Sequence, residues 1–414
     1  MPSNYLYGIF KGYLCPMNKK RQSSQLEFVA LMASLMAIVA LTIDALLPAL
    51  TNIGISIGNT NSTDHQLLIT LIFLGLGLGQ LIFGPLSDSF GRKPIVYIGF
   101  IIFLIASVIC ISAQSLEVML LGRCLQGVGL SAPRTISISI IRDCYKGDRM
   151  AKIMSFVTVI FILVPIIAPT LGMLMLEYYD WKSIFYIQIL FALVVVIWFW
   201  KRQEETLKPK MKIPFSYHVF IDGVKEILKF KDALGFTIIT GLITGAFMVY
   251  LSASQHIFQS QYGLVKEFPL IFAGLAGSVG LATFLNGTLV MKLGMRNLSF
   301  YALIAYTFVA LAYVGLFYNG INPSLFVLIT FLVISFFSLG FLFGNLRAIA
   351  MQPIGHIAGI GAAITGFVST IIAVPIGTYI GTYVISSALP LFIGFFVCGI
   401  LSLVLFTWLG RVQK

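Results

Sequence analysis

The sequence predicts an all-α integral membrane protein in which twelve transmembrane helices form two pseudo-symmetric halves of six. The first observation behind this fold class is composition: 58% of the 414 residues are hydrophobic and only 10% are charged. A soluble domain of this length needs more charge to cover its surface. In lipid, backbone polar groups must be satisfied within their own segment, so long apolar runs form helices. A transmembrane barrel would show alternating apolar and polar residues, and the runs 95–111 and 190–200 do not.

The second observation is the number of apolar runs. A helix needs about 20 residues to cross the hydrocarbon core, and such runs recur from Phe28 to the end of the chain. The first run follows three basic residues, as in a signal peptide. It is too long for one, and the chain after it never becomes polar, so we expect an uncleaved first span. The expected spans are 28–50, 66–86, 94–113, 117–140, 151–174, 182–200, 233–256, 268–291, 298–318, 323–346, 357–384 and 387–408.

The third observation is where the 27 basic residues fall. Between these spans, 23 of them lie on one side of the membrane, Lys182 and Lys266 lie on the other, and Arg123 and Arg134 lie within the fourth span. Basic loops stay in the cytoplasm, so both termini and the middle loop are expected there. This topology and anionic lipid headgroups account for the net charge of +12, so we expect lipid and no nucleic acid as a partner.

An internal repeat divides the chain into halves. Gly84 and Leu86 precede Gly91, Arg92 and Lys93 after the second span, and residues 287–296 place Gly, Leu, Gly and a base at matching offsets 203 positions later. Two six-span halves are typical of secondary transporters. The expected organisation is a cytoplasmic tail over 1–27, a first half over 28–200, a basic linker over 201–232, a second half over 233–410 and a cytoplasmic end over 411–414.

Several kinds of chemistry are not supported by any motif. The five cysteines and four histidines are scattered, with no metal-ligand spacing and no HExxH. The phosphate-binding pattern GxxxxGK[ST] is absent from the sequence, which argues against ATP hydrolysis. We therefore expect a secondary transporter and not an enzyme, with no catalytic residues, no metal and no cofactor. A membrane-embedded enzyme, the distant alternative, would need converging catalytic groups.

Asp44 is the carboxylate that lies well within a predicted span. A charge at mid-membrane costs on the order of 3 kcal/mol on insertion scales, so it needs a reason. Asp44 and Arg123 lie at similar depths, each about six residues from the outer end of its span, which predicts a pair across neighbouring helices. One interpretation is a permanent salt bridge that fixes packing. The other is a carboxylate that binds protons, because burial favours its neutral form and a nearby guanidinium its charged form.

Four motifs in chain order make the sequence recognisable. They read IDALLPALTNIG, GPLSDSFGRKP, LLGRCLQGVGLSAPR and VPIIAPTLG, and GNLRAIAMQPIGHIAG follows in the second half. Over nearly its whole length the chain resembles the major facilitator superfamily. It looks most like the twelve-helix drug/proton antiporters of the bicyclomycin- and chloramphenicol-resistance (Bcr/CflA) branch. The resemblance implies a bacterial inner-membrane location, a proton gradient as energy source and a monomer.

The loop between the second and third spans matches the signature loop of that superfamily. In the family it forms a cytoplasmic latch, whose Asp engages basic side chains and a helix end in the other half. A carboxylate at a helix N-terminus gains about 0.3–1 kcal/mol. Ser89 stands where many members have Arg, and the positive-inside rule alone explains the bases but not the Asp. The matching residues are Gly84, Asp88, Gly91, Arg92 and Lys93, and Arg142 and Asp143 are candidate partners.

Other motif residues carry implied roles. Asp44 and Arg123 match positions that the family associates with proton coupling. The fifth-helix exporter motif is matched by Pro165, Pro169 and Gly172, whose prolines would bend the helix, with Met173 where the family often has Gly. Polar residues that might line a cavity, or equally bond between helices, are Gln126, Tyr250, Gln255, Asn286 and Asn345.

The expected function is proton-coupled export of small, partly apolar compounds by alternating access, that is, multidrug efflux by drug/proton antiport. The alternative on the same fold is a dedicated metabolite, siderophore or nutrient carrier, working as importer or exporter, because fold does not fix substrate or direction. Arg347, near the expected cytoplasmic end of span ten, either attracts an anionic substrate or adds to the positive-inside charge.

Overall fold

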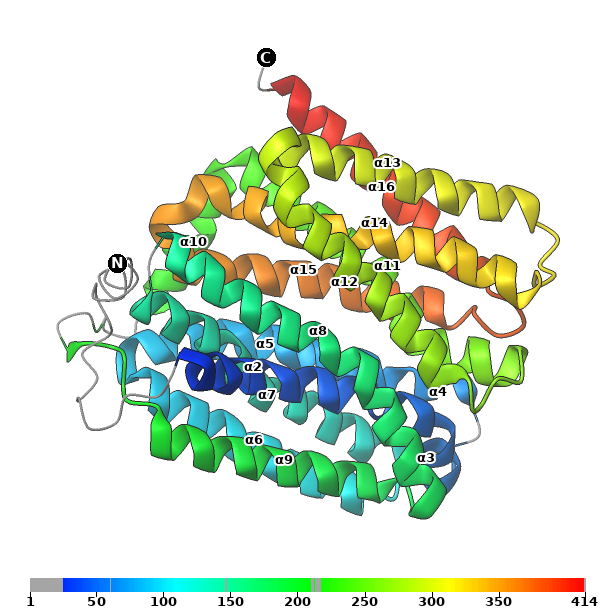
Figure 1. The fold of residues 1–414 in the computed structure, drawn as a ribbon, viewed down its shortest axis with the longest axis horizontal. Helices are drawn as coiled ribbons and strands as arrows, with labels where there is room; N and C mark the ends of the chain where they lie inside the picture. Colours follow the sequence, from blue (N-terminus) through cyan, green and yellow to red (C-terminus); the bar gives the residue numbers. More distant parts are fainter. Residues whose placement is uncertain (1–24, 60, 146, 210–211, 213–216, 413–414) are drawn as a thin grey trace, which may run out of the picture.

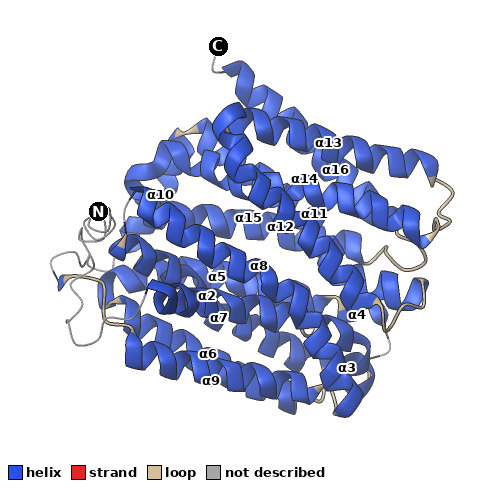
Figure 2. Cartoon of the chain, in the orientation of Figure 1, coloured by secondary structure: helices blue, strands red, loops and turns tan. Residues whose placement is uncertain are grey.

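The computed structural model describes residues 25–59, 61–145, 147–209, 212 and 217–412, and within these ranges helices are joined by loops with no strand (Figures 1 and 2). The helices run back and forth along one common direction, with the blue-to-green helices on one side of the molecule and the yellow-to-red helices on the other (Figure 1). The helices of the first half are α2 (Gln25–Asp44), η1 (Leu47–Ala49), α3 (Leu50–Ser56), α4 (Ser62–His65), α5 (Leu67–Phe90), α6 (Arg92–Ser112), α7 (Leu116–Cys144), α8 (Gly147–Tyr178) and α9 (Lys182–Arg202).

The second half repeats this pattern. A linker helix, α10 (Tyr217–Lys229), precedes it. Its helices are α11 (Lys231–Gln255) with the π-helical continuation η3 (His256–Gln261), α12 (Phe268–Leu293), α13 (Met295–Leu316), α14 (Leu325–Met351) with η4 (Gln352–Ile357), α15 (Ala358–Gly381) and α16 (Leu389–Val412). We call the end of the bundle that carries the α5–α6 loop and α10 the basic end, and the end that carries α3 and α4 the opposite end.

In the described part of the chain, twelve helical units are long enough to cross a membrane, as the sequence predicted. Ten of them are also apolar enough by composition, including α2 to α3 taken as one span of 32 residues. The other two are α7, with 29 residues, and α8, with 32 residues and an apolar stretch over Leu163–Tyr178. The polar residues of α7 face inward, because it packs against α2, α5 and α6. The fold is therefore a multi-pass membrane bundle.

The outer surface confirms that the bundle faces lipid. Ile101, Ile105 and Val108 on α6 are each more than half exposed and follow one another at helical spacing. Similar apolar side chains, such as Phe284 on α12 and Phe308 on α13, point outward from the second half. A soluble protein rarely exposes contiguous apolar surface on this scale.

Glycines allow the closest helix crossing inside the first half. A Cβ atom at Gly127 on α7 would collide with the backbone carbonyl of Ile72 on α5, and a Cβ at Gly75 on α5 would collide with that of Cys124 on α7. Small residues at such crossings let backbones approach within van der Waals contact. By contrast, a Cβ at Gly274 or Gly277 on α12 would meet nothing within 4 Å. Glycine content alone therefore does not mark a contact.

The two halves meet mainly along α5 with α15 and along α8 with α12. Near the basic end Gly84 lies beside Ala363, since a Cβ at Gly84 would be 3.7 Å from that side chain. At the opposite end Gly381 lies against the side-chain amide of Gln66. The α5–α15 contact thus runs nearly the whole height of the bundle.

The region predicted as a linker, residues 201–232, contains α10, which the sequence analysis did not anticipate. Ile227 of α10 packs in a small buried cluster with Ile354 and Ile364 of the second half, and Leu81 of α5 lies against the same cluster. Of the predicted cytoplasmic tails and linker, residues 1–24, 210–211, 213–216 and 413–414 lie outside the described residues.

The internal repeat takes the same local form twice. Gly91 separates α5 from α6 with φ of 119°, and Gly294 separates α12 from α13 with φ of 76°. Both values lie in the region that L-residues with side chains avoid. A single glycine therefore lets one helix follow another almost without a loop.

Substitution of Gly127 by alanine tests the α5–α7 crossing. We expect Gly127→Ala to lower the free energy of unfolding by about 1–3 kcal/mol, the usual cost of overpacking. The matched control, Gly274→Ala, should leave stability unchanged or raise it, since alanine is the better helix former. Thermal unfolding in detergent measures both, and equal effects of the two variants would contradict the close crossing.

Candidate functional site

The first transmembrane helix breaks directly after Asp44. Pro48 has no N–H to donate to the carbonyl of Asp44 four residues earlier. The N–H of Leu46 donates to Ile43 at 3.3 Å, as in a tight turn, instead of to the carbonyl of Thr42. The chain continues as η1 and α3. The break therefore leaves backbone carbonyls without intrahelical partners in the protein interior, where an unpaired polar group is costly.

Arg123 of α7 supplies the missing donors. Its Nη1 and Nη2 both donate to the Thr42 carbonyl at 3.3 Å, and its Nε donates to the Leu68 carbonyl at 3.0 Å. Nη1 also donates to Oε1 of Gln126 at 2.8 Å, and Nε2 of Gln126 donates to Ser107 at 2.8 Å. The Arg123, Gln126 and Ser107 side chains have no exposed surface. This cluster, which we call the arginine clamp, joins four helices of the first half: α2, α5, α6 and α7.

The ion pair predicted between Asp44 and Arg123 is absent from the described part of the structure. Arg123 contacts the helix that carries Asp44, but it does so at the backbone carbonyl of Thr42, two residues before Asp44. Side chains two residues apart on a helix point about 200° away from each other. In addition, most of the five N–H groups of the Arg123 guanidinium already donate to carbonyl oxygens. The two depths agree as predicted, but the side chains point to different partners.

The carboxylate of Asp44 lies between the two halves. It is 5% exposed, and among the described residues it makes no hydrogen bond or ion pair. It interacts electrostatically with Tyr250 on α11, and α11 contacts η1, the segment that follows Asp44. The Tyr250 hydroxyl is buried and has no hydrogen-bond partner in the described structure. Asp44 and Tyr250 thus belong to opposite halves, and in the described part of the chain neither has a hydrogen-bond partner.

Tyr250 sits in a cluster of aromatic rings. The ring of Phe336 lies edge-on at 4.6 Å between centroids, Phe272 is stacked at 6.0 Å, and Phe247 is stacked at 6.4 Å. Phe247 also contacts Phe343 at 5.4 Å. Such packing fixes the orientation of the Tyr250 ring.

The exporter-motif residues pack against the same break. Gly172 of α8 lies directly on the backbone carbonyl of Ala45, and a Cβ there would be 3.0 Å from the ring of Pro48. Pro169 and Pro165 lie about one and two turns before Gly172 within α8. Only a glycine allows α8 to contact the broken segment so closely, so α8 and the Asp44 break are mechanically coupled.

A polar contact joins the halves beyond the break, toward the opposite end. Nε2 of Gln255 on α11 donates to the Thr51 hydroxyl on α3 at 2.9 Å and to Oε1 of Gln259 at 2.8 Å. Gln255 is 6% exposed. The predicted cavity residue Gln255 therefore takes part in a contact between halves.

The predicted latch residues form one connected cluster at the basic end. Arg92 is 3% exposed, and its Nη1 contacts Asp88 at 2.6 Å and Ser87 at 2.7 Å. Its Nε donates to Asp143 at 3.0 Å. Asp143 also accepts from the hydroxyl of Thr206 in the linker at 3.0 Å. Arg92 therefore bridges two carboxylates from α5 and α7.

The sequence analysis missed Glu205, the linker carboxylate that completes this cluster. Its two oxygens accept from the backbone N–H groups of Arg92 and Lys93, both at 3.0 Å, and one also accepts from the N–H of Leu207 at 2.9 Å. The first N–H groups of a helix have no intrahelical acceptor, so Glu205 caps α6. Gly91 makes room, because a Cβ there would be 2.7 Å from the Glu205 carboxylate. The linker holds five acids, so no sequence signal distinguished Glu205 from the others.

The latch cluster also touches the second half. A Cβ at Gly359, in the first turn of α15, would be 3.6 Å from Oδ2 of Asp88 and 4.0 Å from Nη1 of Arg142. A carboxylate at a helix N-terminus is stabilised by the partial positive charge of the unpaired N–H groups. The structure thus brings Asp88 and Arg142 together at the start of α15.

The chain matches the family model described as Major Facilitator Superfamily over residues 29–377. It belongs to the Major Facilitator Superfamily. Membership makes it a transporter and not an enzyme, as the sequence predicted.

Relatives within the superfamily agree with this assignment. The chain is 27% identical to the MFS-type transporter YdgK of Bacillus subtilis, covering 88% of this chain and 90% of that protein. It is 27% identical to a bicyclomycin resistance protein homolog of Haemophilus influenzae (68% and 71%) and 24% identical to the multidrug resistance protein MdtL of Klebsiella pneumoniae (88% and 90%). The crystal structure of the human organic anion transporter MFSD10 shares the fold, with a TM-score of 0.66 at 16% identity, covering 93% of this chain and 100% of that one.

Three of the predicted cavity residues of this superfamily member form hydrogen bonds with other side chains inside the bundle. Gln126 belongs to the arginine clamp and is fully buried. Asn286 of α12 and Asn345 of α14 bond to each other through their side-chain amides, at 2.7 and 3.2 Å. A buried amide in lipid needs a partner, and the neighbouring helix offers one. The alternative of hydrogen bonds between helices therefore holds for these residues.

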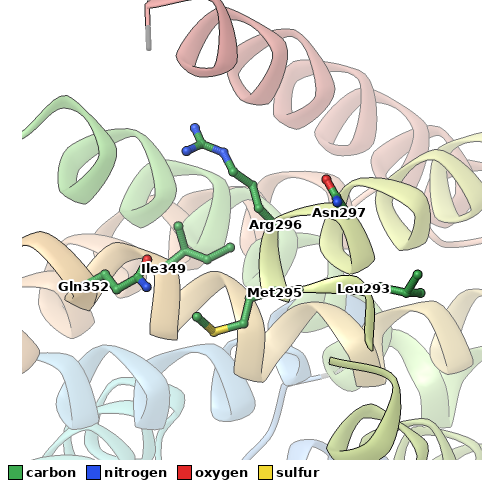
Figure 3. Close-up of a pocket in the computed structure, with 7 residues that line it drawn as sticks. Leu293, Met295, Arg296, Asn297, Ile349 and Gln352 are labelled. Atoms are coloured by element: carbon green, nitrogen blue, oxygen red, sulfur yellow. The ribbon is translucent and has the colours of Figure 1, made fainter. Parts of the chain in front are cut away.

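A surface cavity of about 220 Å³ lies at the second copy of the repeat loop (Figure 3). Its lining includes Met295, Asn297, Ile349 and Gln352. The Arg296 guanidinium points away from the other labelled side chains (Figure 3) and is engaged with Asp232 at 3.5 Å. This cavity opens at the basic end, away from the interface between the halves, so we assign it no transport role.

Loss of the arginine clamp should weaken the first half. We expect Arg123→Gln to lower the free energy of unfolding by about 2–5 kcal/mol, because buried carbonyl groups lose charge-assisted bonds. Arg202→Gln is the matched control: Arg202 is 47% exposed and pairs with Glu27, so its loss should cost less than about 1 kcal/mol. Thermal unfolding in detergent compares the two variants. If Arg123→Gln is as stable as Arg202→Gln, the arginine clamp does not stabilise the first half.

Loss of the Glu205 cap should expose the start of α6. Removal of a capping bond costs about 0.5–2 kcal/mol, so Glu205→Ala should speed amide hydrogen exchange at Arg92 and Lys93 roughly 2- to 30-fold. Glu204→Ala, which removes the adjacent carboxylate, should leave these amides unchanged. Hydrogen exchange at these amides is measured by mass spectrometry on the purified protein. Equal exchange rates in the Glu205→Ala and Glu204→Ala variants would contradict the capping role of Glu205.

Proposed function

We propose that this protein is a proton-coupled exporter of small, partly apolar compounds, working by alternating access in the bacterial inner membrane. The distribution of basic residues supports placing the basic end, both termini and the linker in the cytoplasm. The proton gradient is the energy source. The single chain is the transport unit, because it contains both halves that form the interface.

The observation that carries the proposal is the position of Asp44. It is the carboxylate buried deep within a described span, it has no neutralising partner there, and it lies where the first helix breaks between α8 and α11. Burying an unpaired charge is expensive, whereas the protonated acid is far cheaper to enclose. Uptake of a proton therefore favours states in which the interface closes around Asp44.

The contacts around the break provide a route from proton to motion. Gly172 ties α8 to the segment after Asp44, and Gln255 ties α11 to Thr51 on the same segment. Protonation removes the negative charge of Asp44 and so changes its electrostatic interaction with Tyr250. The Gly172 and Gln255 contacts would transmit the resulting movement to helices of both halves. The latch at Asp88 and Gly359 provides the corresponding closure at the basic end.

The substrate class follows from the relatives and the composition of the interface. Two relatives are named for resistance to bicyclomycin and to multiple drugs, and these names support export of small apolar compounds. The aromatic cluster around Tyr250 supports the same class. A dedicated metabolite carrier or importer is the alternative, and flux measured in both directions in proteoliposomes with an imposed pH gradient separates the two.

Substitution of Asp44 tests the coupling. A growth screen of cells with and without the protein, repeated with a protonophore, first identifies an exported compound. Asp44→Asn should then abolish its proton-driven accumulation, which a driving force of 100 mV can raise by up to about 50-fold, while expression and thermal stability stay the same. The measurement is uptake into inverted vesicles with an imposed pH gradient.

The control is Asp180→Asn, which removes an exposed carboxylate between α8 and α9. It should transport like the wild type. Exchange of labelled for unlabelled compound without a gradient should persist in Asp44→Asn, because exchange needs no proton. Wild-type gradient-driven transport in Asp44→Asn would refute the coupling role.

A further inference from the structure

The linker helix α10 has one buried side, which packs on the second half. A Cβ at Gly223 would be 2.5 Å from the side chain of Ile360 and 2.9 Å from that of Ile364, both on α15. Ile227, one turn after Gly223, packs in the same buried cluster as Ile364. Phe230, between α10 and α11, has an extended backbone with φ of −107° and ψ of 103°. The chain therefore turns at Phe230, and α10 does not continue α11 as one helix.

A second side of α10 is apolar and yet exposed. Ile221, Val224 and Leu228 are 44%, 42% and 59% exposed. Residues spaced by three, four and seven positions line one side of a helix. We call these three residues the apolar stripe. Exposure to water would be unfavourable for three large apolar side chains in a row, so the stripe needs an apolar environment outside the protein.

The remaining side of α10 is charged. At about 100° per residue, Lys225 and Lys229 come next to the apolar stripe, and Asp222 and Glu226 lie beyond them, before the buried side. Lys229 is 67% exposed and pairs with Glu226 at 2.7 Å. Lys225, which borders the stripe, is exposed. Apolar residues on one side of a helix, with lysines on the polar side, are typical of helices that lie in a membrane interface.

The surface of α15 that holds α10 faces outward from the bundle. Ile360 and Ile364, which contact Gly223, lie on the same side of α15 as Ile371, because the three are four and seven residues apart. Ile371 is 42% exposed, whereas Ala373, which points about 200° away from it, is fully buried. The side of α15 under α10 therefore continues into the lipid-facing surface.

The neighbouring helix of the first half agrees with this placement. Leu81 of α5 lies against the buried cluster that contains Ile227 of α10. The residue after it, Ile82, is 48% exposed, and Leu78, one turn before Ile82, is 36% exposed. Lipid-facing side chains of both halves thus adjoin α10, so the apolar stripe is a continuation of the surface that lipid already covers.

The depth of α10 matches the boundary between lipid headgroups and acyl chains. The 24 residues of α15 span about 36 Å, and the hydrocarbon core is about 30 Å thick. Ile360 and Ile364 lie about 3 and 9 Å along the axis from the first residue of α15, Ala358. Interfacial helices bury their apolar side about 5–10 Å deep at this boundary.

We propose that α10 is an interfacial membrane helix. Its apolar stripe lies in the leaflet at the basic end of the bundle, and Lys225, at the border of the stripe, extends to the lipid headgroups. The partner is the phospholipid surface, because the stripe continues the lipid-facing surface and a lysine borders it. This inference rests on the membrane fold and not on proton coupling or on any transported compound.

An interfacial α10 gives the two ends of the linker different attachments. Glu205 and Thr206, near its start, bind the latch cluster of the first half. α10, near its end, packs on α15 of the second half and lies in the lipid. The start of the linker therefore moves with the first half, whereas α10 stays with the second half at the membrane surface.

The test measures the accessibility of nitroxide side chains on α10 in phosphatidylethanolamine–phosphatidylglycerol nanodiscs that hold one protein chain each. A genetically encoded nitroxide amino acid replaces Val224 or Leu228 and leaves the native cysteines in place. Asp222 and Lys229, on the charged side, are the matched control positions, and all four side chains are exposed. At Val224 and Leu228 we expect faster relaxation by oxygen, which partitions into lipid, than by a water-soluble nickel chelate. At the control positions the order should reverse.

A second measurement needs no substitution. Hydroxyl-radical footprinting of the wild-type protein in the same nanodiscs should leave Leu228 unoxidised, although the protein itself leaves this side chain exposed. Oxidation of Leu228, or faster relaxation by nickel than by oxygen at both stripe positions, would place the stripe in water and overturn the proposal. Low accessibility to both reagents would indicate a covering protein segment and would also overturn it. Faster relaxation by oxygen at all four positions would contradict an interfacial helix.

Discussion

The architecture depends on how the first transmembrane helix is allowed to break inside a membrane. A break leaves carbonyl groups unpaired, and no water is available in lipid to satisfy them. The guanidinium of Arg123 satisfies the Thr42 carbonyl and links it to Leu68 and Gln126. Because this clamp stabilises the break, Asp44 can sit at the end of a helix, between the two halves, and not on a continuous helix face.

The clamp also changes how the pairing of acid and base is understood. Asp44 and Arg123 lie at similar depths in their predicted spans, which suggested that Arg123 neutralises Asp44. In the structure Arg123 instead donates to backbone carbonyl groups. Asp44 is then left with Tyr250 as its polar neighbour from the other half. A carboxylate without a fixed counter-ion responds more strongly to a proton than a salt-bridged one, because its charge is balanced by nothing else. The packing role falls to Arg123 and the proposed coupling role to Asp44.

The contacts between halves are distributed along the membrane normal. Thr51 and Gln255 meet beyond the break, toward the opposite end, and Asp88 meets the start of α15 at the basic end. Asp44 lies between these two contacts. A buried carboxylate at this interface makes it sensitive to protons, since protonation alters the free-energy cost of closing the halves. The linker takes part as well, because Glu205 caps the helix that carries Arg92.

The sequence by itself determined the membrane fold, the number of spans, the repeat and the family motifs, because lipid imposes helices of fixed length and glycine loops of fixed form. It also identified Asp44 as unusual, since a charge inside a span needs a reason, and it identified Arg92 and Gly172 through the family motifs that they match. Only the tertiary structure decided partners. That Arg123 binds carbonyls, that Asn286 and Asn345 bond to each other, and that Glu205 caps α6 depend on distances between helices far apart in the chain. No local pattern encodes these distances; the packing of the two halves sets them.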